Sequence, residues 1–276
     1  NGTKTRCVIP GTACLLICML PDLELFSRRI PTYGVAVAIG IALGYWYLYR
    51  RTRTLSVREQ ADCELAYLFG LIGTFLGAKL LSLLTVLPEF LADLRAAALS
   101  PWELVQKYLS AGFVFYGGLY GALLGTLAYL KAARQDVPRL LPVLLPLVPL
   151  LHGVGRVGCF LAGCCYGVPS RFGIAFTRSQ IAPNGVRLLP VQLIEAAGEG
   201  VLFFLLTRPG AQKRGGRWML GAYLAAYGAL RFTLEFFRGD DYRGFLGPLS
   251  LSQTISIATL LLSIPLLLTV SRQKNA

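Results

Sequence analysis

The sequence predicts an all-α integral membrane protein, folded as a single domain over residues 1–276, with about seven helices crossing the bilayer. Of its residues, 55% are hydrophobic and only 15% are charged, and the mean hydropathy is +0.58. Soluble domains of this length are less apolar than that. The apolar runs are long and continuous instead of alternating, which favours helices, because a helix satisfies its own backbone groups in lipid.

A helix needs roughly 20 apolar residues to cross the hydrocarbon core. Runs of this kind occupy residues 31–49, 64–87, 112–131, 140–162, 188–207, 217–238 and 248–270. The sequence thus predicts a helix bundle over residues 31–270, preceded by an extracytoplasmic or interfacial segment over residues 1–30. Residues 7–20 are also apolar, but this run is short and contains Pro10, which favours an interfacial or re-entrant piece. A signal peptide is the alternative, although no clear A-x-A cleavage site follows.

The basic residues outside the predicted spans fall mostly on alternate loops. They are Arg50, Arg51, Arg53 and Arg58, then Lys131, Arg134 and Arg139, then Arg208, Lys213, Arg214 and Arg217, and finally Arg272 and Lys274. The positive-inside rule makes these loops and the C-terminus cytoplasmic, and it leaves the N-terminus outside. Topology and anionic headgroups therefore account for the net charge of +13, and we expect no nucleic-acid partner.

One predicted span keeps charges at membrane depth over residues 227–238. Helical spacing places Tyr227, Arg231, Glu235 and Arg238 on a single face. One interpretation is a structural ion-pair stripe that joins two helices. The other is an anion site, because one carboxylate between two guanidiniums leaves surplus positive charge, and a guanidinium fork fits a phosphate.

A second charged segment covers residues 151–167, where His152, Arg156 and Cys159 share a helix face. Arg156 has no acidic neighbour at helical spacing, so its partner must come from another helix, a ligand or a water-filled cavity. The glycines of this segment allow close helix packing or the approach of a lipid. His152, the single histidine, is either a hydrogen-bonded interior residue or a general base.

Three cysteines, Cys159, Cys164 and Cys165, gather in the same segment. A zinc site with His152, a disulfide and a thiol that carries an acyl or alkyl group are all conceivable. The spacing is not a standard C-x2-C, and adjacent cysteines seldom bind one metal. The pattern favours small, buried residues that line a lipid cavity, with no metal bound.

The run from Gly155 to Gly167, GRVGCFLAGCCYG, resembles the signature G-R-x-G-N-F-x-N-x-E-x-x-G of bacterial prolipoprotein diacylglyceryl transferases, with five of its eight specified positions matched. Further matches keep the order of that family from about residue 20 onward. They are Tyr33-Gly34, Gly77-Ala78-Lys79, Phe115-Tyr116-Gly117-Gly118, Gln192 with Glu195, Tyr227 to Arg238, and Ser252-Gln253.

The resemblance implies a seven-helix enzyme of the bacterial inner membrane. Such an enzyme moves the diacylglyceryl group of phosphatidylglycerol onto the lipobox cysteine of a prolipoprotein, releases glycerol 1-phosphate and needs no cofactor. By the same resemblance, Arg156 and Arg238 hold the lipid phosphate, and Arg231 with Glu235 shapes the site. The residues that it implies for substrate binding are Tyr33, Gly117, Gly118, Gly155, Gly158, Cys159, Gln192, Glu195, Tyr227 and Gln253.

The chain departs from the family pattern at several positions. The two signature asparagines and the glutamate fall on Cys159, Ala162 and Cys164, and the histidine before the Gly-Gly pair falls on Tyr116. Tyrosine is a poor base near neutral pH, so His152 is expected to supply the basic function. Both residues join the arginines and Glu235 as candidate catalytic residues, whereas Glu199 is expected to be structural.

These departures favour a divergent branch, whose acceptor need not be a prolipoprotein. The alternative from another class is a non-catalytic phospholipid-binding or transport protein. Transporters often show internal repeats, and the sequence shows none.

Overall fold

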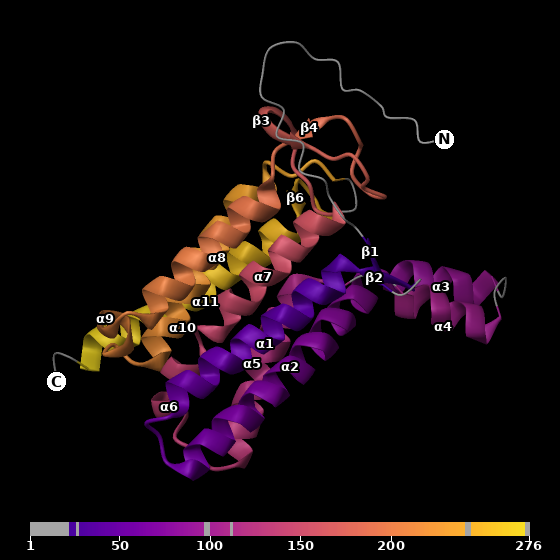
Figure 1. Cartoon of the computed structure of the whole chain (residues 1–276). Helices are drawn as coiled ribbons and strands as arrows, with labels where there is room; N and C mark the ends of the chain where they lie inside the picture. The colour runs from indigo at the N-terminus through magenta and orange to yellow at the C-terminus, as the bar shows by residue number, and fades with distance from the viewer. Residues whose placement is uncertain (1–21, 26–27, 97–99, 111–112, 241–243, 274–276) are drawn as a thin grey trace.

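The computed structural model describes residues 22–25, 28–96, 100–110, 113–240 and 244–273 (Figure 1). The apolar run at residues 7–20 lies outside them. The described helices are α1 (Thr32–Thr52), α2 (Val57–Thr85), α3 (Leu87–Ala96), α4 (Pro101–Ser110), α5 (Phe115–Ala132), α6 (Val137–Leu144), α7 (Leu147–Ala162), α8 (Val191–Thr207), α9 (Pro209–Gln212), α10 (Gly216–Glu235) and α11 (Leu251–Gln273).

Short strands form three antiparallel pairs. They are β1 (Asp22–Leu25) with β2 (Arg28–Pro31), β3 (Pro169–Ala175) with β4 (Arg187–Leu188), and β5 (Phe245–Leu246) with β6 (Leu249–Ser250). All three pairs lie toward the same end of the helix bundle (Figure 1). The fold is therefore mostly helical, as predicted.

A helix overlaps each of the seven apolar runs. Among the described residues, four helical stretches are long and apolar enough to cross a membrane, so the count of about seven spans stays a prediction. These four are α1, α2, the α6–α7 stretch and α11. Large apolar side chains such as Leu76, Leu124 and Phe204 remain exposed on the bundle. An apolar surface of this extent is typical of a face that contacts lipid, so the protein is membrane-embedded.

The basic loops gather at one end of the bundle. The α1–α2 turn, the α5–α6 connection and α9 lie at the end of the bundle where α11 finishes, and α3, α4 and the strand pairs lie at the other end (Figure 1). The alternation of charged loops along the chain thus corresponds to two chemically different ends of the molecule.

Helices α2 and α5 pack with their backbones in contact. A Cβ added at Gly73 would lie 2.1 Å from the carbonyl oxygen of Gly121, and the converse distance is also 2.1 Å. Only glycine permits this approach, which is the usual role of small residues between membrane helices.

The ends of α7 and α10 are joined by backbone hydrogen bonds. Helix α7 stops at Gly163, whose φ of 74° is left-handed, as is common at helix C-termini. Beyond this turn, Gly239 N donates to Tyr166 O at 3.0 Å, and Val168 N donates to Phe237 O at 2.9 Å. These bonds bring the two charged segments of the sequence together.

Candidate functional site

Helices α7, α8 and α10 enclose a set of ionisable side chains, here called the charge cluster. Its members are His152 and Arg156 from α7, Glu195 and Glu199 from α8, Arg231 and Glu235 from α10, and Arg238 and Asp240 from the segment after α10. All are buried except Arg238, which is partly exposed. The two charged segments singled out in the sequence therefore form one site.

Glu195 is the carboxylate that joins the helices. It accepts hydrogen bonds from Arg156 Nη2 at 2.9 Å and from the Tyr227 hydroxyl at 3.2 Å, and Arg231 Nη1 lies 3.9 Å away. The partner of Arg156 thus comes from another helix, one of the options that the sequence left open.

The other two guanidiniums also have acidic partners. Arg231 Nη2 lies 2.7 Å from Glu235 and donates to Ser252 Oγ at 3.2 Å. Arg238 makes a two-pronged ion pair with Asp240, in which Nε donates to Oδ1 at 2.8 Å. The expected surplus of positive charge is therefore wrong for the described residues, because Glu195 and Asp240 were not counted.

His152 belongs to the same network. Its Nδ1 lies 2.7 Å from Glu199 Oε1, and its ring stacks on Phe115 with centroids 3.6 Å apart. Its Nε2 lies 3.7 Å from Glu195 Oε1 and has no hydrogen-bond partner among the described residues. Glu199, expected to be structural, joins α8 to α7 through this contact with the imidazole.

Tyr116 lies beside this network. Its hydroxyl is 2.5 Å from Ser256 Oγ, and its ring lies 5.9 Å from that of Tyr227. Tyr116 thus forms part of an aromatic wall, and its hydroxyl is engaged with α11.

The glycines expected to bind substrate separate into two groups. Gly117 and Gly118 face α2, and a Cβ at Gly117 would lie 2.3 Å from Gly77 O. Gly158 faces α1, where a Cβ would lie 2.8 Å from Ala36. At Gly155, by contrast, an added Cβ would meet no atom of the described structure within 4 Å. The surface of α7 at Gly155 is therefore open, and the other three glycines serve helix packing.

The remaining expected residues differ in position. Gln192 donates to Cys164 O at 2.6 Å, which ties α8 to the end of α7. Tyr33 lies at the start of α1, near Gly158, and is 42% exposed. Gln253 caps the start of α11 through reciprocal bonds with Ser250, so its printed bonds serve the helix end and not the charge cluster.

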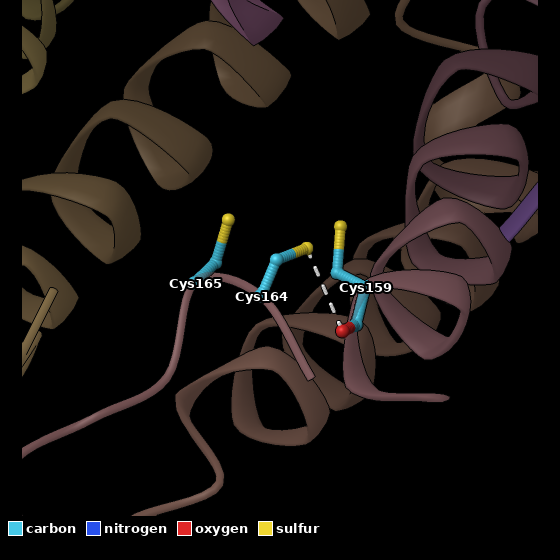
Figure 2. Close-up of side chains that lie close together, drawn as sticks. All are labelled: Cys159, Cys164 and Cys165. Atoms are coloured by element: carbon cyan, nitrogen blue, oxygen red, sulfur yellow. Dashed lines mark hydrogen bonds between the residues drawn. The ribbon is translucent and has the colours of Figure 1, made fainter. Parts of the chain in front are cut away.

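The three cysteines lie where α7 ends (Figure 2). Their sulfur atoms all lie within 4.8 Å of one another, and each thiol is free and partly buried. The neighbouring thiols of Cys159 and Cys164, followed by the guanidiniums of Arg156 and Arg238, hold the pKa of the Cys165 thiol below its usual range. The thiol cluster therefore adjoins the arginines.

Sequence reasoning missed Asp240, Ser252 and Ser256 as partners of the site. Ser252 is one of the family matches, and Asp240 lies between the predicted spans 217–238 and 248–270. An acid two residues beyond Arg238 was the one available signal for the Asp240 pair.

Comparisons with known proteins agree on one family. Residues 23–269 match the family described as prolipoprotein diacylglyceryl transferase. The chain is 36% identical to the phosphatidylglycerol–prolipoprotein diacylglyceryl transferase of Clostridium tetani over 87% of this chain and 93% of that protein. It is 33% identical to a second such enzyme from Clostridium perfringens, over 86% and 90%, and 31% identical to that of Geobacter sulfurreducens, over 88% and 91%. The chain belongs to the prolipoprotein diacylglyceryl transferase family.

Proposed function

We propose that this protein transfers the diacylglyceryl group of phosphatidylglycerol to the cysteine thiol of a prolipoprotein lipobox and releases glycerol 1-phosphate. The observation that carries the proposal is the convergence of Arg156, Arg231 and Arg238 on one buried cluster. A buried guanidinium set of this kind is suited to a phosphate, and the family supplies the lipid that carries one.

On this proposal the lipid phosphate accepts hydrogen bonds from arginine N–H groups that, without lipid, are bound to the carboxylates of the charge cluster. Arg238 is the most exposed of the three arginines, with 11% of its side chain exposed. Its Nε and Nη2 bind the two carboxylate oxygens of Asp240, and the same fork geometry suits a phosphate. As the glyceryl carbon–oxygen bond breaks, charge grows on the phosphate oxygen, and fixed guanidiniums stabilise that charge.

The acceptor thiol must lose its proton as the new sulfur–carbon bond forms. His152 Nε2 takes this proton, directly or through a water, and the Glu199 carboxylate at Nδ1 holds the ring and balances its charge. Tyr116 lines the wall beside it. Glu195, Gln192 and Tyr227 position these groups, and Tyr33 lies near the entry to the site.

The topology follows from the charge asymmetry of the two ends. We assign one integral membrane domain over residues 1–276, with seven spans, the N-terminus outside and the C-terminus in the cytoplasm of a bacterial inner membrane. Arg156 and Arg231 then lie below the extracytoplasmic end, since α7 ends at Ala162 and α10 ends at Glu235. Phosphatidylglycerol enters from the outer leaflet.

The experiment uses the purified chain in liposomes of phosphatidylglycerol with a lipobox peptide. Mass spectrometry should show the peptide gaining diacylglyceryl while glycerol phosphate is released. Replacing one transition-state donor costs about 10²–10³ in kcat, so Arg156→Ala and Arg238→Ala should each lose activity on that scale. Arg171→Ala is the matched control, because Arg171 lies on β3 against Phe172.

Two outcomes contradict the proposal. Activity that survives both arginine changes removes the assigned site. Movement of lipid across the liposome membrane without any chemical change identifies a transport protein instead of a transferase.

A further inference from the structure

Three free thiols at one point of a membrane protein call for an explanation beyond the lipid reaction. Cys159 lies in the last turn of α7, and Cys164 and Cys165 follow the turn at Gly163. Figure 2 shows the sulfur atoms of Cys159 and Cys165 projecting to the same side, with Cys164 between them. All three sulfur atoms lie within 4.8 Å of one another.

This spacing fits one metal ion. A zinc–sulfur bond measures about 2.3 Å, so sulfur atoms bound to the same ion lie about 4 Å apart. The sulfur atoms of the three cysteines, all within 4.8 Å of one another, lie close to that separation. Thiolate sets of this kind select soft ions such as Zn²⁺, Cd²⁺ or Cu⁺ over ions that prefer oxygen.

The backbone holds the two adjacent cysteines in a shape that adjacent cysteines rarely adopt. Cys165 has a φ of 58°, a left-handed conformation that is uncommon for a residue with a side chain. Cys164 N donates to Cys159 O at 3.1 Å, and Gln192 holds Cys164 O at 2.6 Å. The turn thus brings the thiols of Cys164 and Cys165 to the same point. Adjacent cysteines seldom bind one metal, but this backbone shape allows these two to do so.

The surroundings also suit such a centre. Three thiolates and one divalent ion carry a net charge of about −1, counted from thiolate ligands that bind zinc deprotonated. Arg156 lies three residues before Cys159 on α7, and the backbone next to Arg238 is bonded to that next to Cys165, since Gly239 N donates to Tyr166 O at 3.0 Å. The site is partly buried, so these guanidiniums offset that charge at short range.

We infer that Cys159, Cys164 and Cys165 form a binding site for a soft, thiol-seeking metal ion, with Zn²⁺ as the ion to test. The site adjoins the proposed phosphate-binding arginines but is separate from them. It does not depend on the transferase activity, so each can fail alone.

The test loads the purified, reduced full-length chain in detergent with Zn²⁺, removes loosely bound ion with a chelator and measures the retained metal by elemental mass spectrometry. Wild-type protein should retain about one ion per chain, as expected for a single zinc centre. A Cys159→Ser/Cys164→Ser/Cys165→Ser variant should retain none. Cys63→Ser is the matched control, because Cys63 is a buried thiol within α2, and it should retain the ion.

Two further measurements guard against a misfolded variant. The single changes Cys164→Ser and Cys165→Ser should each weaken Zn²⁺ binding by at least about tenfold while elution from a sizing column stays unchanged. Cd²⁺ should add a thiolate charge-transfer absorption band to wild type and not to the triple variant.

The inference is overturned if wild type retains no more Zn²⁺ than the triple variant, or if Cys63→Ser loses as much. It is also overturned if the reduced protein forms a disulfide among these cysteines on purification and then accepts no ion after renewed reduction.

Discussion

At the residue scale, Glu195 shows how a buried charge can be tolerated and used. It is only 1% exposed, yet it accepts a hydrogen bond from Arg156 and another from Tyr227. A buried ion pair adds little net stability compared with apolar packing, but removing one partner leaves the other charge buried without a counter-charge. The pair therefore fixes positions more than it stabilises the fold.

Replacing Glu195 with alanine should lower both stability and transfer activity. The change leaves the Arg156 guanidinium buried without its carboxylate, which typically costs about 3–5 kcal/mol. The measurement is thermal unfolding in detergent, together with peptide lipidation. Glu195→Gln keeps the shape and one acceptor oxygen, so it should unfold nearer to wild type while activity still falls, because Arg156 loses its ionic partner. Equal unfolding temperatures for wild type and Glu195→Ala would contradict this account.

Asp240 occupies the fork of Arg238 that the lipid phosphate is proposed to take. Asp240→Asn weakens that competition because an amide is neutral. We expect the KM for phosphatidylglycerol to fall several-fold, with a smaller effect on kcat, in a steady-state lipidation assay. A rise in KM would instead make Asp240 a residue that positions Arg238. Glu103→Gln, an acid in α4 away from the cluster, serves as the control.

At the element scale, α7, α8 and α10 each place side chains of the site at more than one distance from the end of the bundle that carries the strand pairs. A residue farther from that end is called deeper. Helices rise about 1.5 Å per residue, so His152 lies about 6 Å deeper along α7 than Arg156. On α8, Glu199 lies deeper than Glu195 by the same step, and on α10 Tyr227 lies deeper than Arg231. Phosphate-binding and proton-accepting groups are therefore arranged as successive layers set by helix periodicity.

The contact between α2 and α5 should be intolerant of any side chain at its centre. Gly121→Ala would place a Cβ 2.1 Å from Gly73 O and force the helices apart. Overpacking of this kind costs about 1–3 kcal/mol, and the loss can be measured by thermal unfolding in detergent. Gly200→Ala on α8 is the matched control, because a Cβ there meets nothing within 4 Å. Similar losses for both variants would show that the close contact is unimportant.

Helices α3 and α4 are linked by a carboxylate whose ionisation should control their packing. Lys107 Nζ and the Tyr108 hydroxyl donate to Asp93 Oδ2 at 2.5 and 2.7 Å. The bond from Lys107, followed by that from Tyr108, holds the pKa of Asp93 below its ordinary value of 3.8. The stabilisation is therefore complete above that value and disappears as the pH falls through the lower, folded pKa.

Hydrogen exchange over residues 87–110, corrected for the intrinsic effect of pH, measures this link. At neutral pH, Asp93→Asn should exchange faster than wild type. Below the folded pKa the two proteins should exchange alike. A difference that persists in strong acid would show that Asp93 acts through its shape and not through its charge.

At the scale of the whole molecule, the bilayer decides how much of the fold can be read from the sequence. Helix positions followed from apolar runs, because hydrocarbon thickness sets their length. Helix α2 begins at Val57 and not at 64, since Ser56 and Glu59 form a capping box in the polar loop. Helices α3 and α4 were not predicted, because outside the hydrocarbon no bilayer thickness fixes the length of a helix.

The site was only partly predictable for a related reason. Helical spacing grouped Arg231, Glu235 and Arg238 correctly, since they lie on one helix face or directly beyond its end. The pairing of Arg156 with Glu195 and of His152 with Glu199 depends on which helices are neighbours. A pattern within one segment contains no information on that choice.

The orientation of the whole bundle can be tested with reporter fusions. Alkaline phosphatase needs disulfides that form only outside the cytoplasm. A fusion after Arg134, in the connection from α5 to α6, should be inactive, because that loop lies at the basic end. A fusion after Gly185, between β3 and β4 at the opposite end, should be active. The reverse pattern would place the arginines of the site near the cytoplasmic leaflet, where an acceptor exported across the membrane could not reach them, and the proposed reaction would fail with the topology.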